Sequence, residues 1–297
     1  MSPESHPEAI FRELELRTRR LVEEQLAGEF RSAFKGRGSE FDELRPYTPG
    51  DEVRSIDWNV TARTGIPHSK RSIEERELVV HLLVDISAST HTSSSRGGMK
   101  REAAAEIAGM LAWSAIRANH RVGLTLFSDR IEHSIGPGRG SPQLQRILSD
   151  ILQHAAAGTG TDLAVALEHL GRMAHRPSLV FLLSDFLCRN FHDALAAACR
   201  RHDIVAVMLR NSWESALPDA GTVRMQDAET GHIRIVETGN PAVREAYRNQ
   251  QAISDAALHR DFENCGADHF LIEVGDNYGD KLHGFLKDRQ HRKLRNA

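Results

Sequence analysis

Residues 78–85 read LVVHLLVD, and the expected fold class follows from this segment. It is an almost continuous apolar run that stops at Asp85, which is typical of a strand buried on both faces of a parallel sheet. Residues 178–185, SLVFLLSD, repeat the pattern and stop at Asp185. Further strands of the same sheet are predicted by two more runs, RVGLTLFS at 121–128 and DIVAVML at 203–209.

Segments with helical periodicity separate these runs. Strands that alternate with helices predict an α/β fold, here a doubly wound, mostly parallel sheet with helices on both faces and right-handed crossovers. We expect 130–135 to pair with the preceding strand, and 221–236 to form a small β-hairpin insertion with a Glu-Thr-Gly turn. The predicted helices cover 100–119, 141–154, 161–174 and 191–202, and a closing helix, strand and helix cover 241–263, 268–274 and 278–291.

The N-terminal part of the chain has a different sequence pattern. Residues 8–27 predict an amphipathic helix that Gly28 can end. The segment 36–77 is polar and rich in turns, and Asp51 can cap a short helix there that carries Val53, Ile56 and Val60 inward. The predicted domains are an N-terminal segment at 1–77 and an α/β domain at 78–297, with its core at 78–210, a hairpin at 221–236 and closing elements at 241–291.

The composition excludes several classes of protein. The 297 residues carry a formal net charge of −3, so the chain lacks the basic excess of nucleic-acid-binding domains. Its three cysteines form no C-x-x-C pair, which argues against a disulfide framework or a zinc site. The uncharged stretch at 107–116 is shorter than the roughly 18–20 residues that span a bilayer. Because the N-terminus also lacks a basic and apolar leader, we expect a cytoplasmic protein without a transmembrane segment.

Polar side chains follow the predicted strands at their carboxyl ends, where open α/β sheets bind ligands. The first strand ends in DISAS at 85–89, whose serines can face one way because they are two residues apart. A later strand ends in Ser184-Asp185, and the loop GTGTD at 158–162 precedes a helix. Carboxylates and hydroxyls without Cys or His suit Mg²⁺, Mn²⁺ or Ca²⁺ and not zinc. The candidate metal ligands are Asp85, Ser87, Ser89, Thr161 and Asp185.

Neutral hydroxyl ligands leave a bound divalent ion electrophilic. Water can fill the positions that the protein does not supply, as Mg²⁺ tolerates. A carboxylate from a partner protein could replace one of these waters. The ligand set is therefore that of a metal-dependent docking site.

The five candidate ligands resemble the metal-ion-dependent adhesion site of von Willebrand factor type A domains. The D-x-S-x-S motif at 85–89, Thr161 and Asp185 match it in order. Thr161 is preferred to Thr159 because the family's threonine stands five residues before an Ala-Leu pair. The resemblance implies a von Willebrand factor type A-like domain over about 78–210.

A longer motif upstream is similar to the signature of the bacterial Domain of Unknown Function 58 family. This resemblance implies a metal-dependent protein-protein interaction module and not an enzyme, with Mg²⁺ or Mn²⁺ as its cofactor. It also implies a MoxR-type AAA+ ATPase as partner, in chaperone-like assembly or maturation of other proteins, with an acidic residue of a client as ligand. The matching residues are Gly36, Gly38, Glu40, Phe41, Arg45, Tyr47, Gly50, Asp51, Arg54, Ile56, Asp57, Trp58, Ala62 and Arg63.

Two other functions stay open. Asp85 at the end of a first buried strand, with a later strand-end aspartate, is also typical of Mg²⁺-dependent phosphohydrolases of the haloacid dehalogenase type. Those enzymes need a second aspartate as general acid at the position of Ser87, and a serine cannot do this at neutral pH. A structural scaffold with a vestigial metal site is the other alternative. A serine hydrolase is disfavoured because the sequence has no G-x-S-x-G motif.

Overall fold

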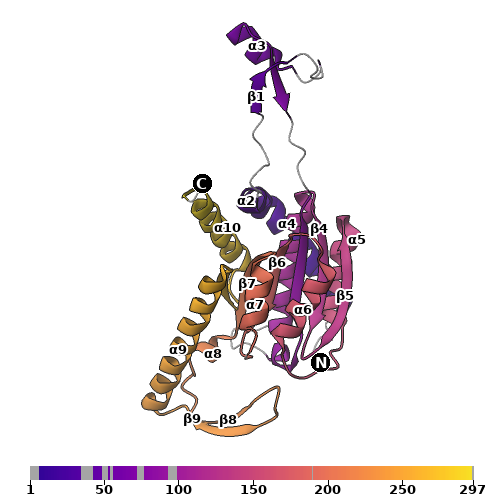
Figure 1. Ribbon diagram of the computed structural model, residues 1–297. Helices are drawn as coiled ribbons and strands as arrows, with labels where there is room; N and C mark the ends of the chain where they lie inside the picture. Colours follow the sequence, from indigo (N-terminus) through magenta and orange to yellow (C-terminus); the bar gives the residue numbers. More distant parts are fainter. Residues whose placement is uncertain are drawn as a thin grey trace.

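The computed structural model describes residues 7–34, 43–48, 53, 56–71, 77–92, 99–188 and 190–295, and it contains a central six-stranded sheet (Figure 1). The strands of this sheet are β3 (Val79–Asp85), β4 (Arg121–Phe127), β5 (Ile131–Gly138), β6 (Leu179–Ser184), β7 (Asp203–Arg210) and β10 (Asp268–Glu273). Their order is β10-β7-β6-β3-β4-β5, and only the edge strand β5 runs antiparallel to its neighbour. The chain leaves β3 toward β4 and returns on the other side with β6. The order of the strands therefore reverses at β3, which is where doubly wound sheets bind ligands.

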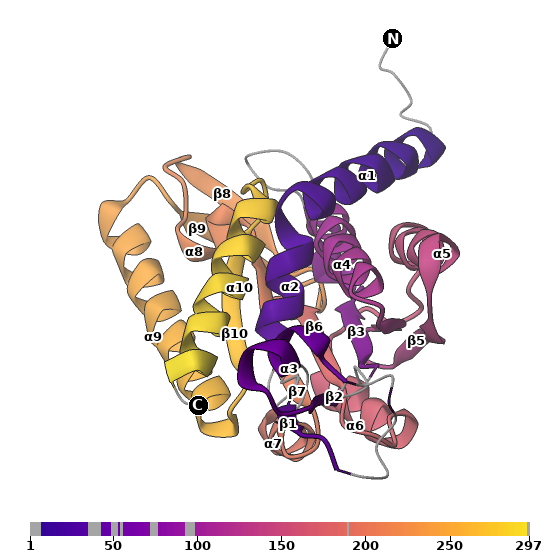
Figure 2. The ribbon, with the colours of Figure 1, turned by 90° about the horizontal axis from the view of Figure 1, so that it is seen from above.

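Helices cover both faces of the sheet (Figure 2). Figure 2 shows α4 and α6 on opposite sides of it. One face carries α1 (Pro7–Leu21), η1 (Val22–Leu26), α2 (Ala27–Phe34), α4 (Lys100–Arg117), α5 (Gly140–Gln153) and α10 (Tyr278–Arg295). The other face carries α6 (Leu163–Met173), α7 (His192–Cys199) and α9 (Pro241–Cys265).

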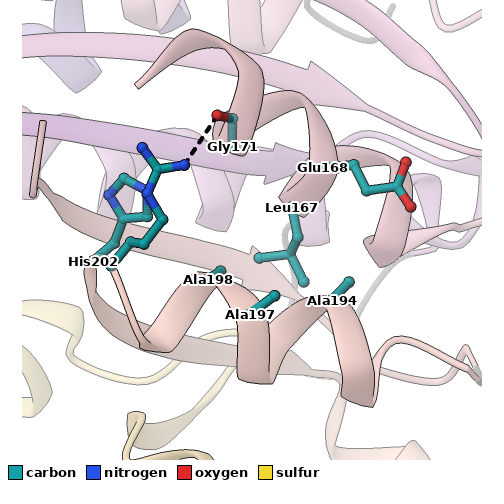
Figure 3. A pocket seen from close by; sticks show the side chains of 8 residues that line it. Leu167, Glu168, Gly171, Ala194, Ala197, Ala198 and His202 are labelled. Carbon is teal, nitrogen blue, oxygen red and sulfur yellow. Dashed lines mark hydrogen bonds between the residues drawn. The ribbon is translucent and has the colours of Figure 1, made fainter. Parts of the chain in front are cut away.

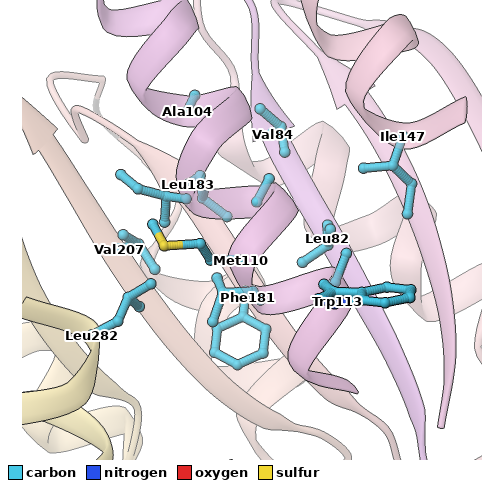
Figure 4. Packing of buried hydrophobic residues seen from close by; sticks show 14 of the residues in the cluster. Leu82, Val84, Ala104, Met110, Trp113, Ile147, Phe181, Leu183, Val207 and Leu282 are labelled. Atoms are coloured by element: carbon cyan, nitrogen blue, oxygen red, sulfur yellow. The ribbon is translucent and has the colours of Figure 1, made fainter. Parts of the chain in front are cut away.

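The alternation of side chains along β3 explains why both faces are apolar. Leu82 and Val84 point into the core under α4, and Leu83 belongs to the second core on the opposite face. Figure 4 shows Met110 of α4 lying among sheet residues such as Phe181. Burial of each large apolar side chain of this kind stabilises the fold by roughly 1.5–3 kcal/mol.

These observations confirm the predicted fold class. The sheet is doubly wound and mostly parallel, helices cover both faces, a helical arm precedes it, and a hairpin is inserted after β7. The strands predicted at 78–85 and 178–185 are β3 and β6. The hairpin consists of β8 (Thr222–Gln226) and β9 (Ile233–Glu237), and the remaining short helices are η3 (Ala88–His91) and α8 (Ser212–Ser215). The domain boundary at residue 77 stays a prediction.

The N-terminal helix does not end at Gly28, so that expectation is wrong. The chain passes through a π-helical turn at Val22–Leu26 and continues as α2 to Phe34. A glycine inside a helix costs about 1 kcal/mol relative to alanine. Burial of Phe30 and Phe34, whose rings lie 4.8 Å apart in the core, outweighs that cost.

A small unit of β1 (Glu43–Pro46), α3 (Trp58–Thr64) and β2 (His68–Arg71) lies at the opposite end of the molecule from the hairpin (Figure 1). The predicted cap Asp51 lies outside the described residues, and Asp57 caps α3 instead, accepting from the amides of Asn59 and Val60 at 3.0 and 3.1 Å. The expectation that Val53 turns inward is wrong, because it is 64% exposed. Of the upstream signature, Gly36, Gly38, Glu40, Phe41, Gly50, Asp51 and Arg54 also lie outside the described residues.

The longer helices carry charges along their length. α4 has 18 residues and α9 has 25, and both include several acidic and basic side chains. Within the described parts of the chain, no helix has the length and hydrophobicity required to cross a membrane.

Candidate functional site

The structure brings the five predicted metal ligands together at the carboxyl ends of β3 and β6. Ser87 Oγ lies 3.2 Å from Ser89 Oγ, and Ser89 donates a hydrogen bond to Asp185 Oδ2 at 2.9 Å. Thr161 Oγ1 lies 2.8 Å from Ser87 Oγ. Asp85 joins the group because its Oδ1 accepts from the amide of Ser87 at 2.9 Å. The cluster, defined here as the hydroxyl-carboxylate site, combines segments that are up to 100 positions apart in the sequence.

Local structure explains how the side chains of the D-x-S-x-S motif at 85–89 come together. Asp85 is the last residue of β3, and Ser87 precedes the 3₁₀ turn η3, which turns the chain back so that Ser89 faces the same centre. Asp85 Oδ2 accepts from Ser184 Oγ at 2.7 Å, so the carboxylate is held across β3 and β6. Both oxygens of Asp85 are thereby engaged by the protein.

Thr161 is held by the loop that precedes α6. The amide of Ala88 donates to the carbonyl of Thr159 at 3.2 Å, which ties this loop to η3. Asp162, the next residue, caps α6 by accepting from the amide of Ala164 at 2.9 Å. The start of the loop is fixed by the amide of Gly158, which donates to Glu132 Oε1 at 2.8 Å.

Gly158 allows the close approach of this loop to β4, and its replacement by alanine should displace the loop. A Cβ atom at Gly158 would lie 2.3 Å from both Ser128 Oγ and Asp129 Oδ1. Overpacking of this kind costs about 1–3 kcal/mol of unfolding free energy, measured by chemical denaturation. Gly160→Ala is the matched control, because the nearest atoms to its Cβ would be at 3.8 and 3.9 Å. Equal stability of the two variants would contradict the argument.

The site is rich in buried negative charge. Asp85 and Asp185 are 2% and 3% exposed. Burial and the neighbouring Asp185 raise the pKa of Asp85 well above its usual range, to about 7. A bound cation would relieve this unfavourable charge.

Lys100 lies at the hydroxyl-carboxylate site, and the sequence interpretation missed it. Its Nζ lies 3.0 Å from Asp185 Oδ2 and 2.7 Å from Glu214 Oε1, and its side chain is 1% exposed. Burial tends to lower the pKa of the Lys100 ammonium, but Asp185 and Glu214 more than offset this, and the pKa is raised. A signal existed: Lys100 stands in the first turn of α4, where the helix dipole disfavours a cation, so a nearby carboxylate was to be expected.

Glu229 is a second residue that sequence reasoning missed. It lies in the turn between β8 and β9, and its Oε1 accepts a hydrogen bond from Thr161 Oγ1 at 2.6 Å. The turn sequence carried no signal that it would reach the site, because the contact depends on how the hairpin folds back over the sheet.

The donor set fits a hard cation. Adjacent oxygens around an octahedral Mg²⁺ ion, each bound at about 2.0–2.1 Å, lie about 2.9 Å apart. The separations of Ser87 Oγ from Thr161 Oγ1 and from Ser89 Oγ, 2.8 and 3.2 Å, bracket that value. The described residues contain no group of three or more His, Cys, Asp or Glu side chains able to hold a metal ion. The candidate site is of another kind, because hydroxyls make up most of its oxygens.

A small cavity of about 160 Å³ lies elsewhere, between α6 and α7 (Figure 3). Leu167 and the alanines of α7 give it a mainly apolar wall, and Arg201 donates to the carbonyl of Gly171 at 3.4 Å beside it. The cavity is below the roughly 300–1,000 Å³ of a small-molecule site. It contains none of the residues of the hydroxyl-carboxylate site.

The chain is similar to a family model and to several bacterial proteins. Residues 43–257 match the model described as "Protein of unknown function DUF58". Uncharacterized proteins of Mycobacterium bovis and of Mycobacterium tuberculosis are each 34% identical over 262 residues, which covers 87% of this chain and 82% of theirs.

Two solved structures give weaker matches. The conserved hypothetical protein BatB from Bacteroides thetaiotaomicron has a TM-score of 0.48 at 14% identity, covering 72% of this chain and 99% of that one. An aerotolerance-related membrane protein from Bacteroides fragilis has a TM-score of 0.46 at 12% identity, with the same coverage. The family match and the mycobacterial relatives decide the assignment: the chain belongs to the DUF58 family.

Proposed function

We propose that this protein is a divalent-cation-dependent protein-binding module. Ser87, Ser89 and Thr161 would hold Mg²⁺ or Mn²⁺ through their hydroxyls, with the carboxylates of Asp85 and Asp185 beside them. When bound, the ion would act as a Lewis acid that coordinates a carboxylate of the partner protein. The observation that carries the proposal is the convergence of three hydroxyls and two buried carboxylates from separate segments at one edge of the sheet.

The surroundings of the site suit docking of a protein. Leu187, two residues after Asp185, is 57% exposed, and its amide donates to Asp185 Oδ1 at 3.2 Å. A large apolar side chain next to a charged centre is the composition of an interface core. Glu229 demonstrates that a carboxylate has room to approach Thr161.

The resemblance to the adhesion-type metal site and the family membership support a MoxR-type AAA+ ATPase as partner. In this proposal the module works in chaperone-like assembly or maturation of other proteins in the cytoplasm, and an acidic residue of the ATPase or of a client is the ligand.

The two alternatives have weaker support. A phosphohydrolase would need Asp85 free to attack phosphate, yet both its oxygens accept hydrogen bonds from the protein. A scaffold with a vestigial site is favoured by one observation, the Lys100 ammonium on Asp185. That single ammonium is shared with Glu214, however, and Asp85 has no cationic partner among the described ion pairs. Negative charge therefore remains for a metal ion to balance.

The test is direct binding of a purified MoxR-type ATPase, measured by interferometry. Wild type and Asp85→Ala are compared at the same Mg²⁺ and nucleotide concentration, because a chelator would also disable the ATPase. We expect binding to the wild type and a loss of at least roughly tenfold in the variant, about 1.4 kcal/mol. Equal binding would contradict the proposal, and Mg²⁺-dependent hydrolysis of a phosphomonoester that is lost in Asp85→Ala would favour the phosphohydrolase.

A further inference from the structure

The β8–β9 hairpin places a carboxylate at the hydroxyl-carboxylate site. Glu229 lies at its tip, and its Oε1 is 2.6 Å from Thr161 Oγ1, although the two residues are 68 positions apart. Thr161 has one hydroxyl proton and a carboxylate can only accept, so Thr161 donates to Glu229. The contact of Thr161 with Ser87 must then use the proton of Ser87.

The turn that carries Glu229 is well ordered by its own hydrogen bonds. Asp227 Oδ1 accepts from the amides of Glu229 and Thr230 at 2.9 and 3.0 Å. The amide of Gly231 donates to the carbonyl of Asp227 at 2.9 Å, and Gly231 has the positive φ of 70° that favours glycine. The carboxylate is therefore presented in a defined direction.

Among the described residues, the other hydrogen bonds that attach the hairpin lie at its base. Its base is fastened, since Thr238 Oγ1 donates to the carbonyl of Gly221 at 2.9 Å. The strands themselves are mostly exposed, and Ile235 is 77% exposed. The tip contact of Glu229 is thus a specific attachment and not a by-product of a packed interface.

The carboxylate of Glu229 brings a further negative charge close to the hydroxyl-carboxylate site. Among the ion pairs of the described residues, none includes Glu229, and its hydrogen-bond donor is the neutral hydroxyl of Thr161. The same cluster already buries Asp85 and Asp185. Like charges repel one another, and the Lys100 ammonium lies on Asp185 and Glu214, so a divalent ion beside Thr161 would favour the approach of a third carboxylate.

The hydrogen-bonded position of Glu229 Oε1 beside Thr161 is also one that a neighbouring ligand of the same ion could occupy. Oxygen neighbours around an octahedral Mg²⁺ lie about 2.9 Å apart. The separation of Thr161 Oγ1 from Glu229 Oε1 is 2.6 Å, similar to the 2.8 Å between Thr161 Oγ1 and Ser87 Oγ.

We propose that Glu229 is an internal ligand of the cation site, so that the hairpin closes over the site when a divalent ion is bound. The inference rests on the proposed function, because it requires a cation at the site. Its consequence for recognition is that a partner's carboxylate takes the position of Glu229. A partner would then have to carry its acidic residue on a protruding loop that displaces the hairpin.

Hydrogen exchange of the backbone amides at 222–237, with and without Mg²⁺, tests this inference on the full chain. In the wild type we expect Mg²⁺ to slow exchange in the hairpin by roughly tenfold. Glu229→Gln keeps the size of the side chain and an acceptor for Thr161 but removes the charge, so the slowing should disappear. In calorimetry this variant should bind Mg²⁺ roughly tenfold more weakly, because one charged ligand is lost. Glu237→Gln is the matched control, since it removes the same charge from β9 at the other end of the hairpin and should behave as the wild type.

The outcomes separate this inference from the proposed function. If the wild type binds Mg²⁺ but hairpin exchange does not change and Glu229→Gln binds equally well, the inference is wrong and the cation site stands. If the wild type binds neither Mg²⁺ nor Mn²⁺ in calorimetry, the proposed function fails and the internal ligand fails with it.

Discussion

Replacing Lys100 with methionine should lower the free energy of unfolding by about 3–5 kcal/mol, the cost of removing one partner from a buried ion pair. Methionine preserves most of the apolar stem and deletes the ammonium, which lies 3.0 Å from Asp185 and 2.7 Å from Glu214. Both carboxylates would then be left buried without a counter-charge. Chemical denaturation at neutral pH without divalent ions measures the loss.

Two comparisons isolate the electrostatic cause. Lys281→Met is the matched control, because Lys281 pairs with Asp276 at 3.5 Å but is 52% exposed, and exposed pairs contribute at most about 1 kcal/mol. Adding Glu214→Gln to the Lys100 variant should recover part of the loss, since one of the unpaired charges is then removed. If Lys100→Met lowers the free energy of unfolding no more than Lys281→Met does, the charge of Lys100 does not stabilise the buried carboxylates around it.

Most of the fold could be predicted from local sequence patterns. The apolar runs LVVHLLVD and SLVFLLSD correspond within one residue to β3 and β6, because a strand buried on both faces consists mostly of apolar side chains. The errors fall where tertiary packing overrides a local signal. Gly28 was expected to end a helix, but the burial of Phe30 and Phe34 carries the helix past it.

The candidate site was predictable to the extent that its residues follow one another at strand ends. Asp85, Ser87 and Ser89 belong to a single short motif. Lys100 and Glu229 were not predictable in the same way, because their contacts with Asp185 and Thr161 span 85 and 68 residues. A short sequence motif carries no information about such contacts. Lys100 contributes an ammonium that neutralises one carboxylate, and Glu229 contributes another carboxylate from the hairpin.

Replacing Asp85 with asparagine should weaken Mg²⁺ binding by at least roughly 100-fold, because affinity for hard cations follows the charge of the ligands. Calorimetry on the wild type should give one ion per chain, and the same titration of the variant measures the loss. Asp162→Asn is the matched control in the adjacent loop. Asp162 caps α6 through the amides of Ala164 and Val165, asparagine is an equally good cap, and this variant should bind Mg²⁺ as the wild type does.

The same substitution should not destabilise the protein when no cation is present. Burial and the neighbouring Asp185 raise the pKa of Asp85, so its charge is unfavourable in the cation-free fold at neutral pH. Asparagine removes that charge and keeps an acceptor for Ser184 or for the amide of Ser87. In chelator the variant should therefore be at least as stable as the wild type, whereas in Mg²⁺ the wild type should be the more stable of the two, because only it gains stability from the bound ion. A variant that unfolds more easily than the wild type in chelator, with unchanged Mg²⁺ affinity, would mean that Asp85 serves the fold and not a cation site.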